Sequence, residues 1–319
     1  MSTPLFALDS WAGDPMHPGT DTPTPVELVA ELTWNQRKQR VRVLIEQAHQ
    51  ILTDALATHT DRHTIVGTCL LWSGGNDSNV LAHLMRPLAT HAVHANTGIG
   101  IEETRQFVRD TAAAWGLPLL ERHPPAGSDY RSYVLEHGFP GPAQHLRMYQ
   151  RLKERALRQV RRELVTRPHR QRVVFLAGRR RAESKRRVRV PLHERDRSVI
   201  WVSPLALWTT LDLNTYRHLH PDTPRNQVSD LLHMSGECLC GSFAEQDELE
   251  QIRQWFPDTA ARIDTLAAEA RANGVPEERC RWGWGAYRPT SRPRADRRRK
   301  TGPLCSSCTA PTLWQQAAS

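Results

Sequence analysis

The sequence contains no stretch approaching the roughly 20 consecutive apolar residues that a membrane-spanning helix needs. Its first residues also lack the basic-then-apolar pattern of a secretory signal. Both absences lead us to expect a cytoplasmic protein that makes no contact with a membrane. Cysteine is nearly missing from the first 237 residues, where only Cys69 occurs. A disulfide framework is therefore not expected.

Lysine is also scarce, and the basic residues are almost all arginine. The formal net charge is +9, which suits phosphate-bearing partners such as nucleotides or nucleic acid. Arginine-rich usage also follows from genome composition, so charge alone leaves nucleic-acid binding open. The 319 residues are 39% hydrophobic, enough for one main domain and a smaller one, and they leave the oligomeric state undetermined.

An apolar run at residues 65–72 breaks abruptly into small polar residues and then resumes at helical spacing. This pattern predicts a buried strand, a tight loop and an amphipathic helix. Glycines allow backbone N–H groups to converge, two serines add hydroxyl donors, and a helix N-terminus adds partial positive charge. The loop therefore indicates a phosphate cradle, although an ordinary strand-to-helix turn has similar chemistry. It consists of Ser73, Gly74, Gly75, Asn76, Asp77 and Ser78.

Alternating strand and helix patterns predict an α/β fold with a doubly wound parallel sheet and a smaller cysteine-rich helical region. Strands are expected at residues 65–72, 91–95, 117–121 and 172–178, and helices at 34–58, 102–115 and 143–164. We assign residues 1–32 to an irregular arm, 33–235 to a nucleotide-binding α/β domain and 236–319 to the cysteine-rich region.

Two further polar segments follow predicted strands. Parallel strands gather their carboxyl ends at one edge of the sheet, where ligands bind. We therefore expect both segments to join the loop at residues 73–78 in one nucleotide site, although a helix-start turn and a solvated basic run are simpler interpretations. The candidate ligand-binding residues are Asn96, Thr97 and Gly98 in one segment and Gly178, Arg180 and Ser184 in the other.

The other five cysteines lie between residues 238 and 308. The Cys-x-x-Cys spacing of Cys305 and Cys308 places two thiolates on one metal ion, and Cys280 with one or both of Cys238 and Cys240 can complete a set of four ligands. The sequence does not show which of Cys238 and Cys240 is the ligand. Four thiolates suit structural Zn²⁺ or a [4Fe–4S] cluster, and spacing does not separate the two. Thiols without metal are the simpler alternative. The other candidate ligands are Cys238, Cys240 and Cys280.

The order Ser-Gly-Gly-x-Asp-Ser at residues 73–78 resembles the pyrophosphate-binding loop of the ATP pyrophosphatase (PP-loop) superfamily, whose fold is adenine nucleotide alpha hydrolase-like. Residues 96–104 and 178–184 resemble the Asp-Thr-Gly, Glu-Thr and Gly-x-Arg-x-x-Glu-Ser segments of phosphoadenosine-phosphosulfate (PAPS) reductase-like enzymes. Residues 203–213 resemble that family's Pro-Leu, Trp-Thr and Asp-Leu segment. The chain departs from the family at Asn76, where lysine is common, and at Asn96, where aspartate is usual.

This resemblance implies that ATP, with Mg²⁺, is cleaved between its α and β phosphates and that a substrate is adenylated. Residues 73–78 would hold the leaving pyrophosphate, and Asp77 would orient Mg²⁺ or the loop. Arg180 and Arg187 would neutralise the charge that develops at the α-phosphorus. With Asn76 in place of lysine, a charged contact to the pyrophosphate is either missing or supplied from elsewhere.

The resemblance also favours an iron–sulfur cluster over zinc, because related sulfonucleotide-reducing and DNA-phosphorothioating proteins often carry one. We therefore expect sulfur transfer from a donor such as a cysteine desulfurase to nucleic acid, in DNA phosphorothioation or tRNA thiolation. A sulfonucleotide reductase is the second hypothesis. It is weakened because the chain lacks that group's Glu-Cys-Gly-x-His tail and adjacent cysteine pair. A non-catalytic nucleic-acid-binding module is the third.

Overall fold

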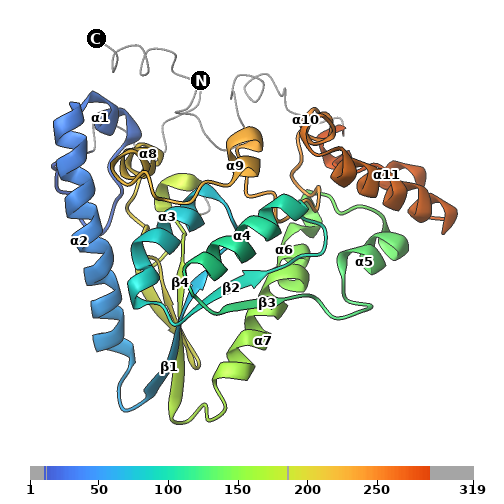
Figure 1. Ribbon diagram of the computed structural model, residues 1–319. Helices are drawn as coiled ribbons and strands as arrows, with labels where there is room; N and C mark the ends of the chain where they lie inside the picture. The colour runs from blue at the N-terminus through green and yellow to red at the C-terminus, as the bar shows by residue number, and fades with distance from the viewer. Residues whose placement is uncertain (1–10, 12, 185–186, 288–319) are drawn as a thin grey trace.

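The computed structural model describes residues 11, 13–184 and 187–287. Within them, six strands form one sheet in the order β3-β2-β1-β4-β6-β5 (Figure 1). Neighbouring strands are parallel except for the β5–β6 pair, which is antiparallel. The strands are β1 (Thr64–Leu71), β2 (His91–Ala95), β3 (Leu119–Arg122), β4 (Gln171–Ala177), β5 (His193–Asp196) and β6 (Val199–Val202).

The predicted doubly wound α/β fold is confirmed, with one correction. The sheet is mixed and not wholly parallel, because residues 193–202 fold back as a hairpin onto β4. Arg197 has a φ of 55° in the turn of this hairpin. The outer strand β5 has the polar and mostly exposed sequence His-Glu-Arg-Asp, so no hydrophobic pattern in the sequence indicated it.

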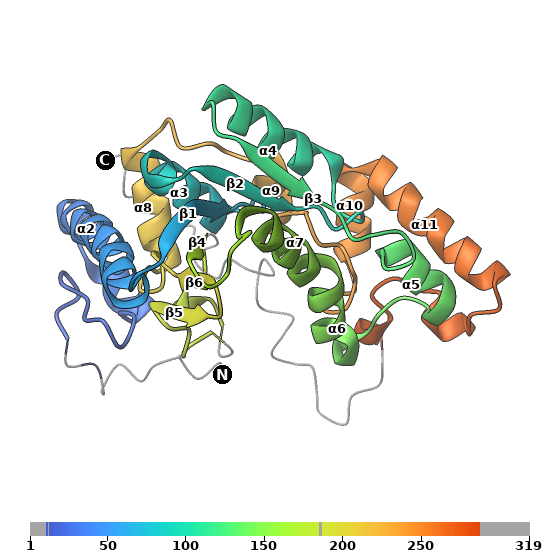
Figure 2. The ribbon, with the colours of Figure 1, turned by 90° about the horizontal axis from the view of Figure 1, so that it is seen from below.

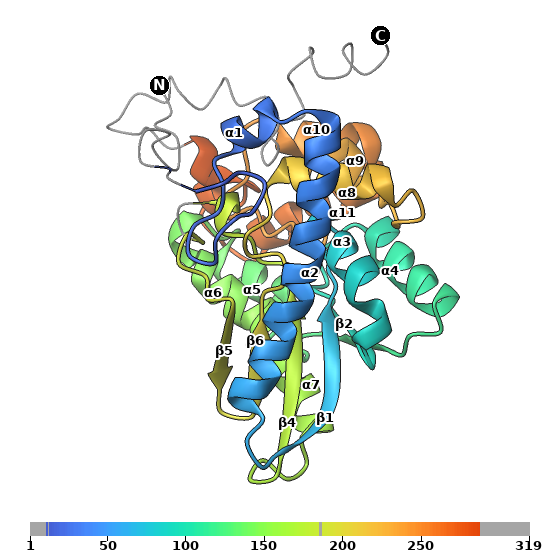
Figure 3. The ribbon, with the colours of Figure 1, turned by 90° about the vertical axis from the view of Figure 1, so that its left-hand side faces the viewer.

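Helices cover both faces of the sheet because strand side chains alternate between them (Figure 2). Leu70 and Leu176 pack into one core, and their neighbours Cys69 and Phe175 pack into another on the opposite face. The first core is covered by α2 (Trp34–His59), α3 (Asn76–Met85), α4 (Glu102–Ala114) and α8 (Thr210–Leu219), and the second by α7 (Arg155–Leu164). Figure 3 shows α2 running along the sheet beside β5 and β6.

A further hydrophobic core lies beyond the β3 edge and joins two segments that are distant in sequence. It packs residues 99–152 against residues 228–282, so the expected boundary at residue 235 passes through it. Its helices are α5 (Tyr130–His137), α6 (His145–Tyr149), α9 (Gln227–Leu232), α10 (Glu248–Trp255) and α11 (Pro257–Ala272). Within the expected irregular arm, residues 26–31 form the short helix α1 (Val26–Glu31).

Shorter turns complete the described secondary structure. A π-helical turn, Gln150–Glu154, connects α6 to α7 inside the expected long helix. Turns of 3-10 helix are found at Arg86–Leu88, Pro142–Gln144, Arg181–Glu183, Glu277–Arg279 and Trp284–Tyr287. Of the helices in the described residues, none is both long and apolar enough to cross a bilayer.

The strand order fixes where a ligand binds. From β1 the chain adds β2 and β3 on one side, and then places β4, β6 and β5 on the other. The order therefore reverses between β1 and β4. In open α/β sheets the crevice for ligands lies at the carboxyl ends of the two strands that flank such a reversal.

Candidate active site

The loop that follows β1 has a backbone conformation that requires glycine, and contacts from other segments hold it in place. Gly74 has a φ of 76°, and a Cβ atom there would lie 2.8 Å from Cγ2 of Thr104, so a larger residue would be strained and crowded. The Gly74 carbonyl accepts hydrogen bonds from Asn226 Nδ2 at 3.0 Å and from Ser229 Oγ at 3.1 Å. The loop is thus fixed from α4 and from the segment that begins α9.

The next residues present donors toward the crevice. Helix α3 begins at Asn76 after an N-cap glycine, Gly75, that supplies no side-chain cap. The first N–H groups of α3 are therefore available to a ligand, with the positive end of the helix dipole behind them. The Ser73 and Ser78 hydroxyls lie 3.2 Å apart at the same place. This geometry is what a phosphate group requires.

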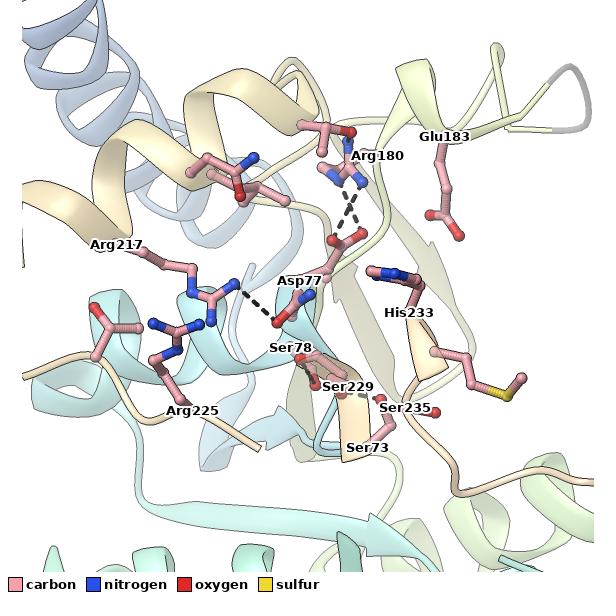
Figure 4. A pocket seen from close by; sticks show the side chains of 18 of the residues that line it. Ser73, Asp77, Ser78, Arg180, Glu183, Arg217, Arg225, Ser229, His233 and Ser235 are labelled. Atoms are coloured by element: carbon pink, nitrogen blue, oxygen red, sulfur yellow. Dashed lines mark hydrogen bonds and ion pairs between the residues drawn. The ribbon is translucent and has the colours of Figure 1, made fainter. Parts of the chain in front are cut away.

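These donors open into a cavity of about 830 Å³, which we call the carboxyl-end pocket (Figure 4). Its size lies within the range usual for small-molecule sites. The predicted residues that line it are Ser73, Gly75, Asn76, Asp77, Ser78, Gly178, Arg180 and Arg187. Residues that the sequence did not single out also line it, among them Lys153, Arg217, Arg225, Ser229, His233 and Ser235.

Asp77 and Arg180 form a bidentate ion pair beside the loop at residues 73–78. The Asp77 carboxylate accepts from Arg180 Nε at 2.8 Å and from Nη2 at 3.2 Å (Figure 4). Arg180 is only 5% exposed, so its charge depends on this partner. The close approach of β4 to α3 positions the pair, because a Cβ atom on Gly178 would lie 3.3 Å from the Asp77 backbone.

A second ion pair, between Arg187 and Glu183, lies on the same wall of the pocket. Burial raises the pKa of the Glu183 carboxyl, and the Asp77 charge adds to this rise while Arg187 opposes it. An anion bound near Arg180 and Arg187 would compete with Asp77 and Glu183 for these guanidinium groups. The pocket therefore holds charges that are already paired with carboxylates.

Arg217 of α8 brings a cation to the residue where the PP-loop sequence departs from its relatives. Its Nη1 donates to Asn76 Oδ1 at 3.1 Å, and its Nη2 lies 3.3 Å from an Asp230 oxygen. Arg225 approaches the same carboxylate at 3.1 Å. Arg217, 141 residues further along the chain, thus places a guanidinium group beside the side chain at position 76.

Five of the predicted binding residues, Gly74, Asn96, Thr97, Gly98 and Ser184, are not among the lining residues of this pocket. Thr97 is buried, and its N–H donates to Glu237 Oε1 at 2.7 Å. Asn96 Nδ2 donates to Glu121 at 2.6 Å, and its Oδ1 accepts from the Gly98 N–H at 2.9 Å. The segment after β2 therefore ties the sheet to the residues that precede the first clustered cysteines.

Glu237 forms the centre of this connection, and the sequence gave no signal for it. Its side chain is 1% exposed and lies 3.0 Å from Nε2 of the equally buried His94. Gly100 packs directly on the Glu237 backbone, where an added Cβ atom would lie 2.7 Å from the carbonyl oxygen. The loop that carries Cys238 is consequently fixed to the carboxyl end of β2.

The cysteines that the structure describes do not form a complete metal site. Cys238 hydrogen-bonds to Cys240, and this bond holds the pKa of Cys240 well below its usual range, helped by His145 and Ser242. Cys280 instead contacts the Val275 carbonyl, with Sγ 3.3 Å from the oxygen. No cluster of three or more metal-ligating side chains occurs within residues 11, 13–184 and 187–287. Cys305 and Cys308 lie outside the described residues.

The chain resembles solved structures at low sequence identity. Two similar solved structures are PAPS reductase from Candida auris in a phosphate complex, and the U34-tRNA thiolase NcsA from Methanococcus maripaludis with its [4Fe-4S] cluster. The first has 18% sequence identity and a TM-score of 0.39, and covers 63% of this chain and 93% of its own. The second has 11% identity and a TM-score of 0.39, and covers 74% and 82%. No curated protein matches the chain in sequence.

The family comparison is more informative. The model of the phosphoadenosine phosphosulfate reductase domain matches residues 67–227, half of the chain. That interval contains most of β1, the loop at residues 73–78, Arg180 and Arg217, and it includes most of the residues that line the carboxyl-end pocket. The chain therefore belongs to the phosphoadenosine phosphosulfate reductase domain family.

Proposed function

We propose that the chain is a cytoplasmic PP-loop ATP pyrophosphatase that adenylates an acceptor oxygen and supports sulfur transfer to nucleic acid, either DNA or tRNA. One observation carries the proposal. The uncapped N-terminus of α3, the hydroxyls of Ser73 and Ser78, and the guanidinium groups of Arg180 and Arg217 all line the same pocket. Such a set of donors suits the triphosphate of a nucleotide.

In the proposed reaction the acceptor oxygen attacks the α-phosphorus, and the bond from that phosphorus to the bridging oxygen of the β-phosphate breaks. The loop N–H groups, both hydroxyls and Arg217 hold the pyrophosphate that leaves. Arg180 and Arg187 stabilise the charge that develops on the α-phosphate oxygens. Asp77 aligns Arg180 before the nucleotide binds. When Arg180 turns to the phosphates, Asp77 would hold Mg²⁺, which neutralises phosphate charge when bound.

We assign sulfur delivery to the loop that carries Cys238 and Cys240, which Glu237 fixes to the sheet. Cys238 and Cys240 would provide two ligands of a [4Fe–4S] cluster or of Zn²⁺, with the remaining ligands from other cysteines of the chain. A sulfur donor such as a cysteine desulfurase would supply the sulfur atom. Iron and zinc analysis of anaerobically purified protein, with a visible spectrum, separates the two metals.

The experiment that tests adenylation is the release of pyrophosphate from ATP, measured with DNA, with tRNA and without an acceptor. Ser78→Ala removes a donor from the pocket and is expected to lower the rate about 10- to 100-fold. Thr265→Ala removes an exposed hydroxyl on α11 and serves as the matched control. The proposal fails if no acceptor yields pyrophosphate, or if Ser78→Ala releases it as fast as Thr265→Ala.

A sulfonucleotide reductase is the second candidate, because the chain belongs to the phosphoadenosine phosphosulfate reductase domain family. A thiolate is the nucleophile that would attack the sulfur of adenylyl sulfate or its 3′-phosphorylated form, displacing the nucleotide. A thiol reductant would then release sulfite. Sulfite formation that Cys240→Ser abolishes would favour this reaction over adenylation. A chain that binds nucleic acid but forms neither product would match a non-catalytic binding module.

A further inference from the structure

A second cavity lies at the opposite end of the strands, where β1, β4 and β6 begin. β1 starts at Thr64, β4 at Gln171 and β6 at Val199, and the residues just before and after these starts surround a space of about 410 Å³. We call it the amino-end pocket. It is lined by His63, Arg161, Pro168, His169, Arg172, Arg195, Arg197 and Ser198. In Figures 1 and 3 the loops that enter β1 and β4 lie at the far end of the molecule from α8 and α9.

The lining of the amino-end pocket carries four arginines and two histidines, with no acidic side chain. Asp61, outside the lining, is the carboxylate partner of Arg172, with Oδ2 2.9 Å from Nη2. Arg161 Nη1 donates to the neutral Ser198 hydroxyl at 3.3 Å. The positive potential extends to His59, where burial lowers the pKa and the charges of Arg195 and Arg172 lower it further. The pocket is therefore strongly cationic and only partly compensated.

Arg172 is a buried cation of the amino-end pocket, and one of its nitrogens lacks a hydrogen-bond acceptor within the part of the chain that the structure describes. The residue is 2% exposed, and its Nη1 is buried without a hydrogen-bond partner among the described residues. Nδ1 of His63, at the same pocket, is also buried and unpartnered. An unsatisfied guanidinium nitrogen costs stability, because it has lost its water without gaining an acceptor. The Asp61 ion pair accounts for one nitrogen of Arg172 and leaves the other without an acceptor.

We propose that the amino-end pocket binds a phosphate group, with Arg172 and His63 at its base and Arg161, Arg195 and Arg197 at its rim. The guanidinium fork matches phosphate oxygens in shape and charge. The phosphate is either that of a free anion such as pyrophosphate or one link of a nucleic-acid backbone. Because this pocket lies at the other end of the strands, the inference is independent of the adenylation chemistry.

The test uses calorimetric titration of the full chain with pyrophosphate and, separately, with a single-stranded DNA oligonucleotide. The pyrophosphate data are fitted to two sites, because in the proposed reaction the carboxyl-end pocket also binds this anion. Arg161→Gln is expected to weaken binding at the amino-end pocket about tenfold. Its matched control is Arg162→Gln, which removes an exposed charge from the same helix outside the pocket. Arg197→Gly is a second variant that preserves the fold, since a φ of 55° suits glycine.

The two ligands separate the two sources of phosphate. Weaker binding of pyrophosphate and DNA together supports a site for any phosphate group, whereas weaker binding of DNA alone supports a backbone site. In the second case the slope of log K against log salt should fall by about one for each charge removed. Unchanged binding of both ligands by Arg161→Gln and Arg197→Gly overturns the proposal. Release of pyrophosphate from ATP should be unaffected by either variant, so failure here is distinct from failure of the proposed reaction.

Discussion

The two ends of the sheet carry arginine-rich pockets that differ in how their charges are compensated. Each arginine that lines the carboxyl-end pocket has a carboxylate partner among the described residues. The pairs are Arg179 with Glu194, Arg180 with Asp77, Arg187 with Glu183, and Arg217 and Arg225 with Asp230. Of the four arginines that line the amino-end pocket, only Arg172 has such a partner in the described part of the chain.

Under the two proposals, this difference would distinguish a pocket that releases its product from a pocket that retains its ligand. At the carboxyl end a phosphate must displace carboxylates from the arginines, so part of the binding energy is consumed in that exchange and the product can leave. At the amino end an anion satisfies donors that have no other acceptor, so its binding meets less competition. Removing an arginine should therefore have opposite consequences for stability at the two ends.

The largest effect is expected for Arg180→Met. It removes a guanidinium from the position where charge develops, so the rate of pyrophosphate release should fall about 10²- to 10³-fold. The measurement is the steady-state rate with saturating ATP. A variant that retains the rate within threefold would contradict the role given to Arg180.

The Arg40–Asp212 pair provides the control for that experiment. It is fully buried between α2 and α8, with Nε and Oδ1 2.8 Å apart, and it does not line the carboxyl-end pocket. Arg40→Met should destabilise the chain by about 3–5 kcal/mol, because Asp212 stays buried without its partner. The rate per folded molecule should be unchanged, which separates loss of stability from loss of catalysis.

A smaller effect, about a tenfold fall in pyrophosphate release, is expected for Arg217→Ala. Arg217 donates to Asn76 at 3.1 Å and supplies the charge that the loop itself lacks. Adding Asn76→Lys to this variant should recover most of the rate, whereas Asn76→Lys alone should add little. A double variant no faster than Arg217→Ala would show that the two positions do not exchange this role.

The position of Arg217 beside Asn76 could not be predicted from the sequence. The loop at residues 73–78 was visible because strand, glycines and helix are contiguous, and local chemistry determines such a unit. The alternating pattern likewise predicted the fold and the pocket end of the sheet. Arg217 and Asn76 are 141 residues apart, so only the packing of α8 against α3 brings them together.

The segment at residues 96–98 shows a different limit. Its position after β2 led us to expect a third wall of the nucleotide site. Instead its groups are bonded to Glu121 and Glu237, and none of them lines the carboxyl-end pocket. Sequence position places a residue at an edge of the sheet, but hydrogen-bond partners from distant segments decide which way its side chain faces. The buried cation Arg172 was overlooked for a different reason, because charged side chains on strands are rarely buried.

At the amino end, removal of one rim charge should stabilise the chain. Arg195 is exposed and has no carboxylate partner in the described residues, so Arg195→Gln relieves repulsion among neighbouring cations. We expect a gain of a few tenths of a kcal/mol in the free energy of unfolding at low salt, which disappears at high salt. Denaturant titrations at two ionic strengths measure it. A loss of stability would remove the contrast between the two ends.

The smallest expected difference between the two pockets is in how variants of each change the pH dependence of the free energy of unfolding. Burial raises the pKa of Glu183 above its ordinary value of 4.5, so the folded chain binds this proton more tightly than the unfolded chain does. The stabilisation that protonation gives is complete below that ordinary value and is lost as pH rises through the raised pKa. Glu183→Gln resembles the protonated form and removes this dependence. Its advantage in unfolding free energy over the parent chain should therefore grow from pH 4.5 to pH 8. The advantage of Arg195→Gln should instead shrink as pH rises through the titration of His59, because the Arg195 charge lowers the pKa of that imidazole and repels its protonated form. An advantage of Glu183→Gln that stays constant over this range would mean that the pKa of the Glu183 carboxyl is not raised in the folded chain, and it would remove this contrast between the two pockets.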